Sequence, residues 1–353
     1  MMKKVDGKPS KLFGGLLTFL RKFLFKVVSV GPIPDHVAFI MDGNRRYAKK
    51  HNSHAGTGHE AGYSSLMSML AYCYELGVKY VTVYAFSIDN FKRRPEEVQY
   101  LMDLMLEKIE GLFEHEIIVN QYGIRVYFIG NLKLLNEPVR LAAENVMKAT
   151  AKNNKATLLV CVAYTSCDEI LNAIQEACKC RRNEIQTSKV SGSENEEIHE
   201  DKKSNGLVIH DLQESYEDGF HGFEAVDTNR ICNRGIGHSA KASCEDDAED
   251  FAIRTCNGLM DQAQVCENQR NLPTIKLVNV EKHMYMAVAP DPDIVIRSSG
   301  ETRLSNFLLW QTAYCPLYSP TALWPELGLW HLIWAVLNFQ RSYQYLEKKR
   351  KKM

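Results

Sequence analysis

From residue 34 onward, short apolar runs alternate with longer stretches of helical periodicity. The short runs, typical of buried strands, are 36–41, 80–86, 124–129, 157–163 and 293–297. Helical spacing covers 63–76, 96–119, 137–152, 168–180 and 275–286. The alternation predicts an α/β fold, a single domain with a central, mostly parallel sheet flanked by helices. Ligands of such sheets bind at the carboxyl ends of the strands.

Residues 12–30 are apolar but interrupted by Arg21, Lys22 and Lys26. Their apolar positions recur at steps of three and four, which predicts an amphipathic helix. The uncharged stretch 12–20 is shorter than the roughly 20 residues needed to span a bilayer. We therefore expect residues 1–33 to be a segment that associates with a membrane surface. The alternative is a helix that packs on the protein body or on a partner.

Residues 183–272 interrupt the α/β pattern. They are rich in Ser, Asn, Gly and Glu, and they carry eight bases against nineteen acids. So long a connection without apolar periodicity predicts an acidic, disordered insertion; one alternative is a retained intron. The predicted catalytic domain then comprises residues 34–182 and 273–341, followed by a basic tail, 342–353.

The chain of 353 residues has 43 Lys and Arg against 43 Asp and Glu, so its formal charge is zero. This balance gives no reason to expect nucleic-acid binding. The bases gather at the two ends, which suits an anionic membrane surface. None of the ten cysteines forms a CxxC pair. Scattered thiols of a cytosol-facing protein are therefore favoured over a zinc site.

Polar and charged residues follow the first two predicted strands. Asp42, Gly43, Asn44, Arg45 and Arg46 come directly after the first strand. Such a loop, running into a helix, can present backbone N–H groups and bases to a phosphate. A carboxylate among these bases suits a divalent cation between it and the phosphate, although the same residues also form ordinary turns.

The second strand is followed by Ser87, Asn90 and three bases, including Arg93. A solvated basic loop is the plainer interpretation of that segment. His59 begins a predicted helix, where a histidine is more often structural than a phosphate ligand. Taken one at a time, these positions do not define a site.

A longer cluster follows the last predicted strand. Arg297 and Arg303 flank a Ser-Ser-Gly turn, with Glu301 between them and Ser305 just beyond. Guanidinium groups bind phosphate oxygens bidentately, so this segment can hold a second anionic ligand. Farther on, Glu326 supplies one more carboxylate.

Three segments resemble the signature motifs of the cis-prenyltransferases, the enzymes that make Z-polyprenyl diphosphates. They are residues 36–46, 84–93 and 297–311, in the order that the family has them. The resemblance covers roughly 34–182 and 273–341 and is closest to the catalytic subunits of eukaryotic dehydrodolichyl diphosphate synthases. Residues 281–286 and 343–349 resemble the plant members of the family. The resemblance implies a six-stranded sheet with an apolar tunnel.

The resemblance also implies a role for each site residue. Asp42 matches the aspartate that positions Mg²⁺ and assists departure of diphosphate, and Ser87 and Asn90 match polar residues near the reacting carbons. The expected site for the allylic diphosphate consists of Gly43, Asn44, Arg45, Arg46, His59 and Arg93. The expected site for isopentenyl diphosphate consists of Arg297, Arg303, Ser305 and Glu301. Glu326 matches a late carboxylate with metal or interface contacts, so the expected metal ligands are Asp42 and Glu326.

The implied reaction condenses isopentenyl diphosphate units onto an allylic diphosphate, giving a long-chain polyprenyl diphosphate for dolichol and protein glycosylation. The growing tail is expected in a tunnel lined by Leu101, Met102, Leu104, Met105, Ile109, Leu112, Phe113, Ile117 and Ile118. The implied location is the cytosolic face of the endoplasmic reticulum membrane. The alternatives are a synthase of shorter chains and, in a different class, a non-catalytic partner subunit. A partner subunit would usually lack Asp42 and the arginines.

Two departures from the family pattern matter. Ala55 stands where many members have an arginine, so one phosphate contact is in doubt. The chain ends in bases and lacks the Arg-x-Gly segment that homodimeric members use to complete the active site. We therefore expect a heteromer in which a non-catalytic subunit of the same family supplies that segment.

Overall fold

The computed structural model describes residues 11–114, 123–191 and 275–350. Contacts divide the chain into two units, one of residues 1–180 with 275–353 and one of residues 181–274. Of the second unit only the helical residues 181–191 are described. The expected insertion and the residues at positions 117 and 118 therefore lie largely or wholly outside the described part.

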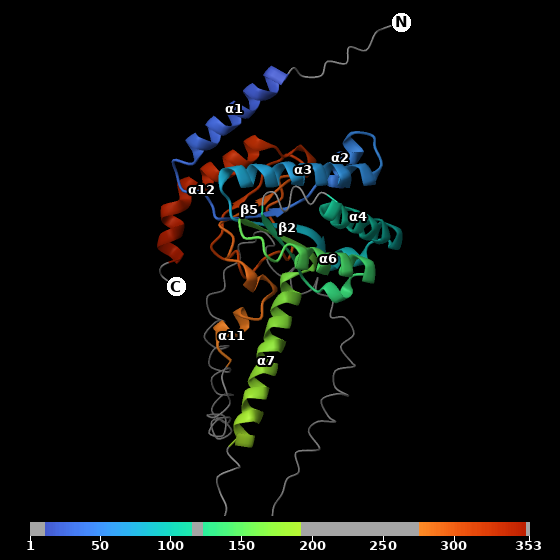
Figure 1. Cartoon of the computed structure of the whole chain (residues 1–353), viewed down its shortest axis with the longest axis vertical. Coiled ribbons are helices and arrows are strands. Elements are labelled where there is room, and N and C mark those ends of the chain that lie inside the picture. The colour runs from blue at the N-terminus through green and yellow to red at the C-terminus, as the bar shows by residue number, and fades with distance from the viewer. Residues whose placement is uncertain (1–10, 115–122, 192–274, 351–353) are drawn as a thin grey trace, which may run out of the picture. The chain divides into compact units, whose positions relative to one another are not determined.

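One sheet of six parallel strands forms the centre of the first unit (Figure 1). The strands are β1 (His36–Ile40), β2 (Tyr80–Ser87), β3 (Ile124–Ile129), β4 (Ala156–Tyr164), β5 (Ile294–Arg297) and β6 (Leu317–Tyr318). Their order across the sheet is β3-β4-β2-β1-β5-β6. The predicted α/β class and parallel sheet are confirmed. The apolar runs located five of the strands, but β6 has only two residues, too few for a period-two pattern.

Eight α-helices lie within the described residues. They are α1 (Lys11–Val28), α2 (Asn44–Lys50), α3 (Ala55–Leu76), α4 (Pro95–Glu114), α6 (Glu137–Ala149), α7 (Ser166–Ser191), α11 (Leu277–Glu281) and α12 (Leu329–Arg350). Short 3₁₀ helices are η1 (Ile88–Lys92), η2 (Leu132–Leu134), η4 (Tyr285–Val288) and η5 (Trp324–Glu326). The predicted helix 275–286 is wrong as one element, since it is broken into α11 and η4. Helix α7 extends past 182, so the boundary expected at 183 falls inside a helix.

Alternating strand residues bury the two faces of the sheet. Phe39 of β1, Val83 of β2 and Ile296 of β5 face a core completed by α1, α3, α4, α6 and α12. In Figure 1, α3 and α12 lie beside each other over the sheet. Ala38 and Leu159 face the other side, which is covered by the segments around residues 286 and 307–308. Because both faces are buried, the strands have the near-continuous apolar character on which their prediction rested.

Helix α1 packs on the body through one side only. Phe25 and Val28 are buried in the main core, and the side-chain amide of Gln340 on α12 donates a 2.8 Å hydrogen bond to the Val28 carbonyl. The other side exposes Phe19, Phe23 and further apolar residues. Among the described residues, no helix is both long and apolar enough to cross a membrane.

Candidate functional site

The site begins where β1 and β5 end side by side. Ile40 pairs with Arg297 in the parallel register, so Asp42, two residues beyond Ile40, comes close to Arg297. Residues separated by 255 positions thus meet at one sheet edge, as the carboxyl ends of parallel strands should. The sequence predicted both clusters but could not show that they are in direct contact.

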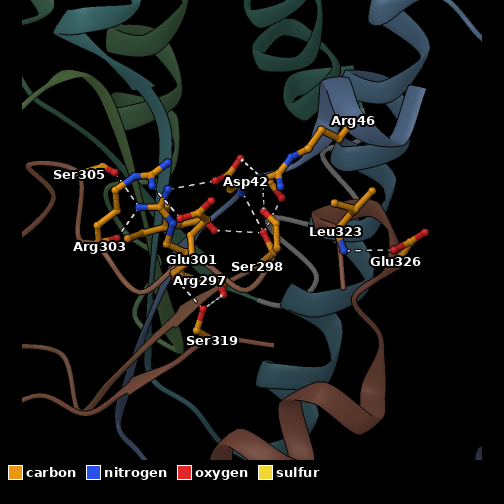
Figure 2. A network of polar contacts seen from close by, with 12 residues as sticks. Asp42, Arg46, Arg297, Ser298, Glu301, Arg303, Ser305, Ser319, Leu323 and Glu326 are labelled. Carbon is orange, nitrogen blue, oxygen red and sulfur yellow. Dashed lines mark hydrogen bonds and ion pairs between the residues drawn. The ribbon is translucent and has the colours of Figure 1, made fainter. Parts of the chain in front are cut away.

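The carboxylate of Asp42 is bonded by two arginines (Figure 2). Arg297 Nη2 lies 3.0 Å from Oδ2, and Arg46 Nη2 lies 3.2 Å from Oδ1. Burial opposes ionisation of Asp42, but the hydrogen bonds and charges of Arg297 and Arg46 outweigh it and hold the pKa of this carboxyl below its usual value. Asp42 is therefore a carboxylate at neutral pH.

Arg297 is almost completely buried, with 4% of its side chain exposed. Besides Asp42, its guanidinium donates to Ser305 Oγ at 2.6 Å and to the Arg303 carbonyl oxygen. Arg303 is exposed and pairs with Glu301 at 2.7 Å. The structure thus brings together all four residues expected around isopentenyl diphosphate, with Arg297 as the fixed member and Arg303 as the accessible one.

The loop after β1 folds as the start of α2. Gly43 caps that helix with φ 106°, a left-handed conformation that glycine adopts without strain. A side chain at this position would also approach Leu323 Cδ2 to 2.9 Å. Asn44 begins α2 and lines the cavity described below, whereas Arg45 and Arg46 are largely exposed.

Glu97 on α4 organises two of the expected phosphate-binding arginines. It accepts from Arg93 at 2.9 Å and from Arg45 at 3.4 Å. The sequence analysis missed Glu97. The available signal was its position four residues after Arg93, the spacing of a helical ion pair. His59, which lines the cavity, has its pKa lowered by burial and by the charge of Arg93.

Ser87, the last residue of β2, and Asn90 of η1 form a reciprocal cap at the start of η1. Asn90 Oδ1 accepts from the Ser87 amide at 3.0 Å, and Ser87 Oγ accepts from the Asp89 amide at 3.2 Å. Both side chains therefore hold the turn that leads to Arg93 in place.

Glu326 does not bond with the groups around Asp42. One oxygen accepts from Lys50 at 2.6 Å. The other accepts from the Leu323 amide at 3.1 Å (Figure 2). The Lys50 hydrogen bond is the main reason why the pKa of Glu326 lies below its usual value. Within the described residues, no group of three or more His, Cys, Asp or Glu side chains is arranged to hold a metal ion.

An apolar cavity of about 500 Å³ extends from the Asp42 loop between the sheet and helices α3 and α4. Its lining includes Met41, Asn44 and His59 near the loop, and Glu75 and Lys108 farther along the helices. Most of the remaining lining is apolar and comes from three sources: Leu66, Met67 and Leu70 of α3; Leu101, Leu104, Met105 and Ile109 of α4; and Val83, Val126, Phe128, Leu158, Val160 and Val162 of the strands. Four of the predicted tunnel residues thus line it, whereas Met102 is buried outside the lining.

This geometry defines a class of protein. Two arginine-rich groups and a carboxylate meet at the carboxyl edge of a parallel sheet, beside a cavity suited to a hydrocarbon chain. Such a site suits an enzyme that acts on two phosphorylated substrates, at least one of them with an apolar tail.

The comparisons with known proteins identify the family. A family model described as "Putative undecaprenyl diphosphate synthase" matches residues 40–216 and 243–346. Dehydrodolichyl diphosphate synthase 6 of Arabidopsis thaliana is 50% identical over 352 residues, 100% of this chain and 98% of that protein. The human dehydrodolichyl diphosphate synthase complex subunit DHDDS is 33% identical over 95% of this chain and 76% of its own length.

The chain belongs to the cis-prenyltransferase family and is a transferase. A solved structure of lavandulyl diphosphate synthase from Lavandula x intermedia shares the fold, with a TM-score of 0.57 and 21% identity over 87% of this chain and 95% of that one.

Proposed function

We propose that the chain condenses isopentenyl diphosphate with an allylic diphosphate, such as farnesyl diphosphate, and repeats the step to make a long-chain Z-polyprenyl diphosphate for dolichol. The observation that carries this proposal is the Asp42 carboxylate, held between Arg46 and Arg297 and next to Met41, which lines the apolar cavity. The names of the plant and human relatives, which are dehydrodolichyl diphosphate synthases, support the product class.

In the proposed complex, each diphosphate occupies one side of Asp42. The allylic diphosphate lies over Gly43, Asn44, Arg45 and Arg46, near His59 and Arg93, with its tail in the cavity. Isopentenyl diphosphate lies on Arg297, Arg303 and Ser305, and Glu301 orients Arg303. Binding of these anions replaces the contacts between Asp42 and the two arginines.

The reaction forms one carbon–carbon bond and breaks one carbon–oxygen bond. The terminal alkene carbon of isopentenyl diphosphate attacks C1 of the allylic substrate while diphosphate departs, and a proton from C2 leaves to give the cis double bond. Arg45, Arg46 and Arg93 stabilise the charge that develops on the departing diphosphate. Departing diphosphate is the proposed proton acceptor, because Ser87 and Asn90 already cap η1.

Of the two expected metal ligands, Asp42 fits Mg²⁺ and Glu326 fits less well. Mg²⁺ in proteins is held by one or two carboxylates together with substrate phosphates, and Asp42 is an ionised, partly exposed carboxylate beside both proposed diphosphate positions. When bound, Mg²⁺ would supply charge neutralisation at the departing diphosphate. Glu326 fits less well, because Lys50 and the Leu323 amide already bind its two oxygens.

The proposed location is the cytosolic surface of the endoplasmic reticulum membrane. The exposed apolar residues of α1 next to Lys22 and Lys26 support peripheral association.

The proposed partner is a non-catalytic subunit of the same family that supplies an Arg-x-Gly segment. Support comes from the human relative, whose name describes a complex subunit, and from Trp330 and Trp334, which α12 exposes to solvent.

The test is incorporation of radiolabelled isopentenyl diphosphate into chains primed by farnesyl diphosphate, with and without Mg²⁺, followed by separation of the products by length. We expect Mg²⁺-dependent synthesis of long chains. Products that end after one or two additions would instead favour a synthase of short chains. No incorporation under any condition, including co-expression with the partner subunit, would refute the proposal.

A further inference from the structure

Ser298 directly follows β5 and is completely buried. Its hydroxyl oxygen accepts a hydrogen bond from the Asp42 amide at 2.8 Å and donates one to the Asp42 carbonyl oxygen at 2.6 Å. One side chain from the end of β5 therefore holds both backbone polar groups of the residue that follows β1. Figure 2 shows Ser298 beside Asp42, with the two contacts between them.

These bonds join the two halves of the site. Arg297 immediately precedes Ser298, and Gly43 immediately follows Asp42, so the hydroxyl connects the chain segments that carry the two sets of bases. The Asp42 carbonyl also accepts from the Trp324 amide at 2.9 Å. Next to Ser298, Ser299 has φ 69°, and its hydroxyl accepts from Arg46 at 2.5 Å. Since Asp42 is bonded on several sides, its backbone has little freedom to shift.

The rate of a reaction between two bound substrates depends on the distance between the sites that hold them. Two bound substrates react quickly only when their reacting atoms are aligned, and a misplacement of about 1 Å can lower the rate roughly 10²-fold. We propose that Ser298 is a positioning residue that fixes the distance between the two substrate sites. The proposal rests on the assignment of Arg297 to isopentenyl diphosphate and of the Asp42 loop to the allylic diphosphate.

The test compares Ser298→Ala with Thr150→Val. Thr150 is a matched control, because its buried hydroxyl also accepts from a backbone amide (Val126, 3.1 Å) and donates to a carbonyl (Val146, 2.9 Å), at the α6–β3 contact. The full chain, with its partner subunit if the wild type requires one, is assayed for the single-turnover rate and for KM of each substrate. Melting temperature is measured for every variant.

We expect both variants to melt at a lower temperature than the wild type, because each loses two buried hydrogen bonds. Only Ser298→Ala should reduce the single-turnover rate, by about tenfold or more, while KM for each substrate changes by less than about threefold. If Ser298→Ala does not fold, Ser298→Cys keeps the shape and replaces the hydroxyl by a weak donor, and the same rate loss is expected.

Three results would overturn the proposal: an unchanged rate in the Ser298 variant, an equal rate loss in Thr150→Val, or a large rise in KM for one substrate alone. The last result would place Ser298 in a single binding site. A wild-type enzyme that shows no turnover even with the partner subunit contradicts the proposed function instead, so the two failures are distinguishable.

Discussion

Asp42 and Arg297 form an ion pair in which each side chain is the counter-charge of the other. Arg297 is buried, and a buried guanidinium without a counter-charge is costly. Asp42 supplies that charge, while Ser305 and the Arg303 carbonyl accept further hydrogen bonds from the same guanidinium. The charge of Arg297 is therefore preorganised, because its guanidinium is held at a fixed position before a diphosphate binds.

Replacement of Asp42 by alanine should abolish most of the condensation without unfolding the chain. We expect the turnover number to fall by about 10²-fold or more, because the carboxylate beside both diphosphates is lost. Arg297 keeps its two other acceptors, so circular dichroism should show a folded protein. Asp89→Ala is the control, since Asp89 is an exposed carboxylate of η1 paired with Lys92. Normal turnover by the Asp42 variant would exclude this residue from the mechanism.

His36 is a buried residue that links β1 to two other segments. Its Nδ1 lies 2.6 Å from the Pro290 carbonyl oxygen, which can only accept, so Nδ1 carries the proton. Nε2 then accepts from the Thr82 hydroxyl at 2.7 Å. Burial is the main cause that lowers the pKa of His36 to about 4, because the charged imidazolium would lose its water.

This histidine should make the stability of the fold depend on pH. The folded state prefers the neutral form of His36, whereas the unfolded chain takes up a proton below pH 6.5. The contribution of His36 to the free energy of unfolding is therefore complete above pH 6.5 and is lost as the pH falls from 6.5 to about 4. The loss amounts to about 3 kcal/mol of the free energy of unfolding. Urea unfolding across this range should show it. His36→Gln should flatten the dependence, whereas the exposed His51→Gln should not; equal slopes in all three proteins would contradict the prediction.

At the scale of elements, α1 packs on the protein body with one side and exposes apolar residues on the other. Phe25 and Val28 pack in the core, and Arg21 pairs with Glu75 of α3 at 2.8 Å. Phe19 and Phe23 are 65% and 59% exposed on the rest of the helix. The periodicity predicted an amphipathic helix, and the structure shows which apolar residues the body covers and which remain available.

Acidic substitutions on the exposed side of α1 should weaken membrane association. Phe19→Glu combined with Phe23→Glu removes apolar area and adds negative charge near anionic lipid, while it leaves Phe25 and Val28 in place. We expect less of the chain to pellet with phosphatidylserine vesicles, with turnover in detergent unchanged. Leu141→Glu, on the exposed side of α6, is the matched control. Unchanged pelleting of the double variant would refute the membrane role of α1.

The longer elements could be predicted because their patterns are regular. Strands β1 to β5 and helices α3, α4, α6 and α7 each contain a run of apolar residues at strand or helix spacing. The expected strand bounds lie within a few residues of the observed ones, whereas α3 begins well before the predicted position 63 and α7 ends well after the predicted position 180. Strand β6 could not be predicted, since its two residues are fixed by pairing with Val295 and Ile296. The segment 275–286 has helical spacing, yet it folds as α11 and η4 because Met284 and Met286 turn into the protein.

At the scale of the whole molecule, the proposed heteromer makes activity depend on a second chain. The purified chain alone should turn over at least about tenfold more slowly than a complex co-expressed with a family member that ends in Arg-x-Gly, because the partner's arginine would add positive charge at the diphosphates. Turnover and size by light scattering are measured on the same samples. A complex whose partner has lost that terminal arginine is the control. Full activity of the chain alone would refute the need for a partner.

The sequence by itself determined the fold class and the types of residue in the site. Strand periodicity, the parallel arrangement and the polar clusters at strand ends are local patterns, and local patterns can be detected along a chain. The family resemblance then supplied roles for Asp42, Arg46 and Arg297.

Only the tertiary structure decided which of those residues touch. Arg297 contacts Asp42, Arg45 pairs with Glu97, and Lys50 binds Glu326. In each of these pairs the two side chains are far apart in sequence. The same is true of Ser298, which no motif distinguishes from its neighbour Ser299. The physical reason is that hydrogen bonds and ion pairs act over a few ångströms, so strand register and helix packing must be fixed before such partners are defined.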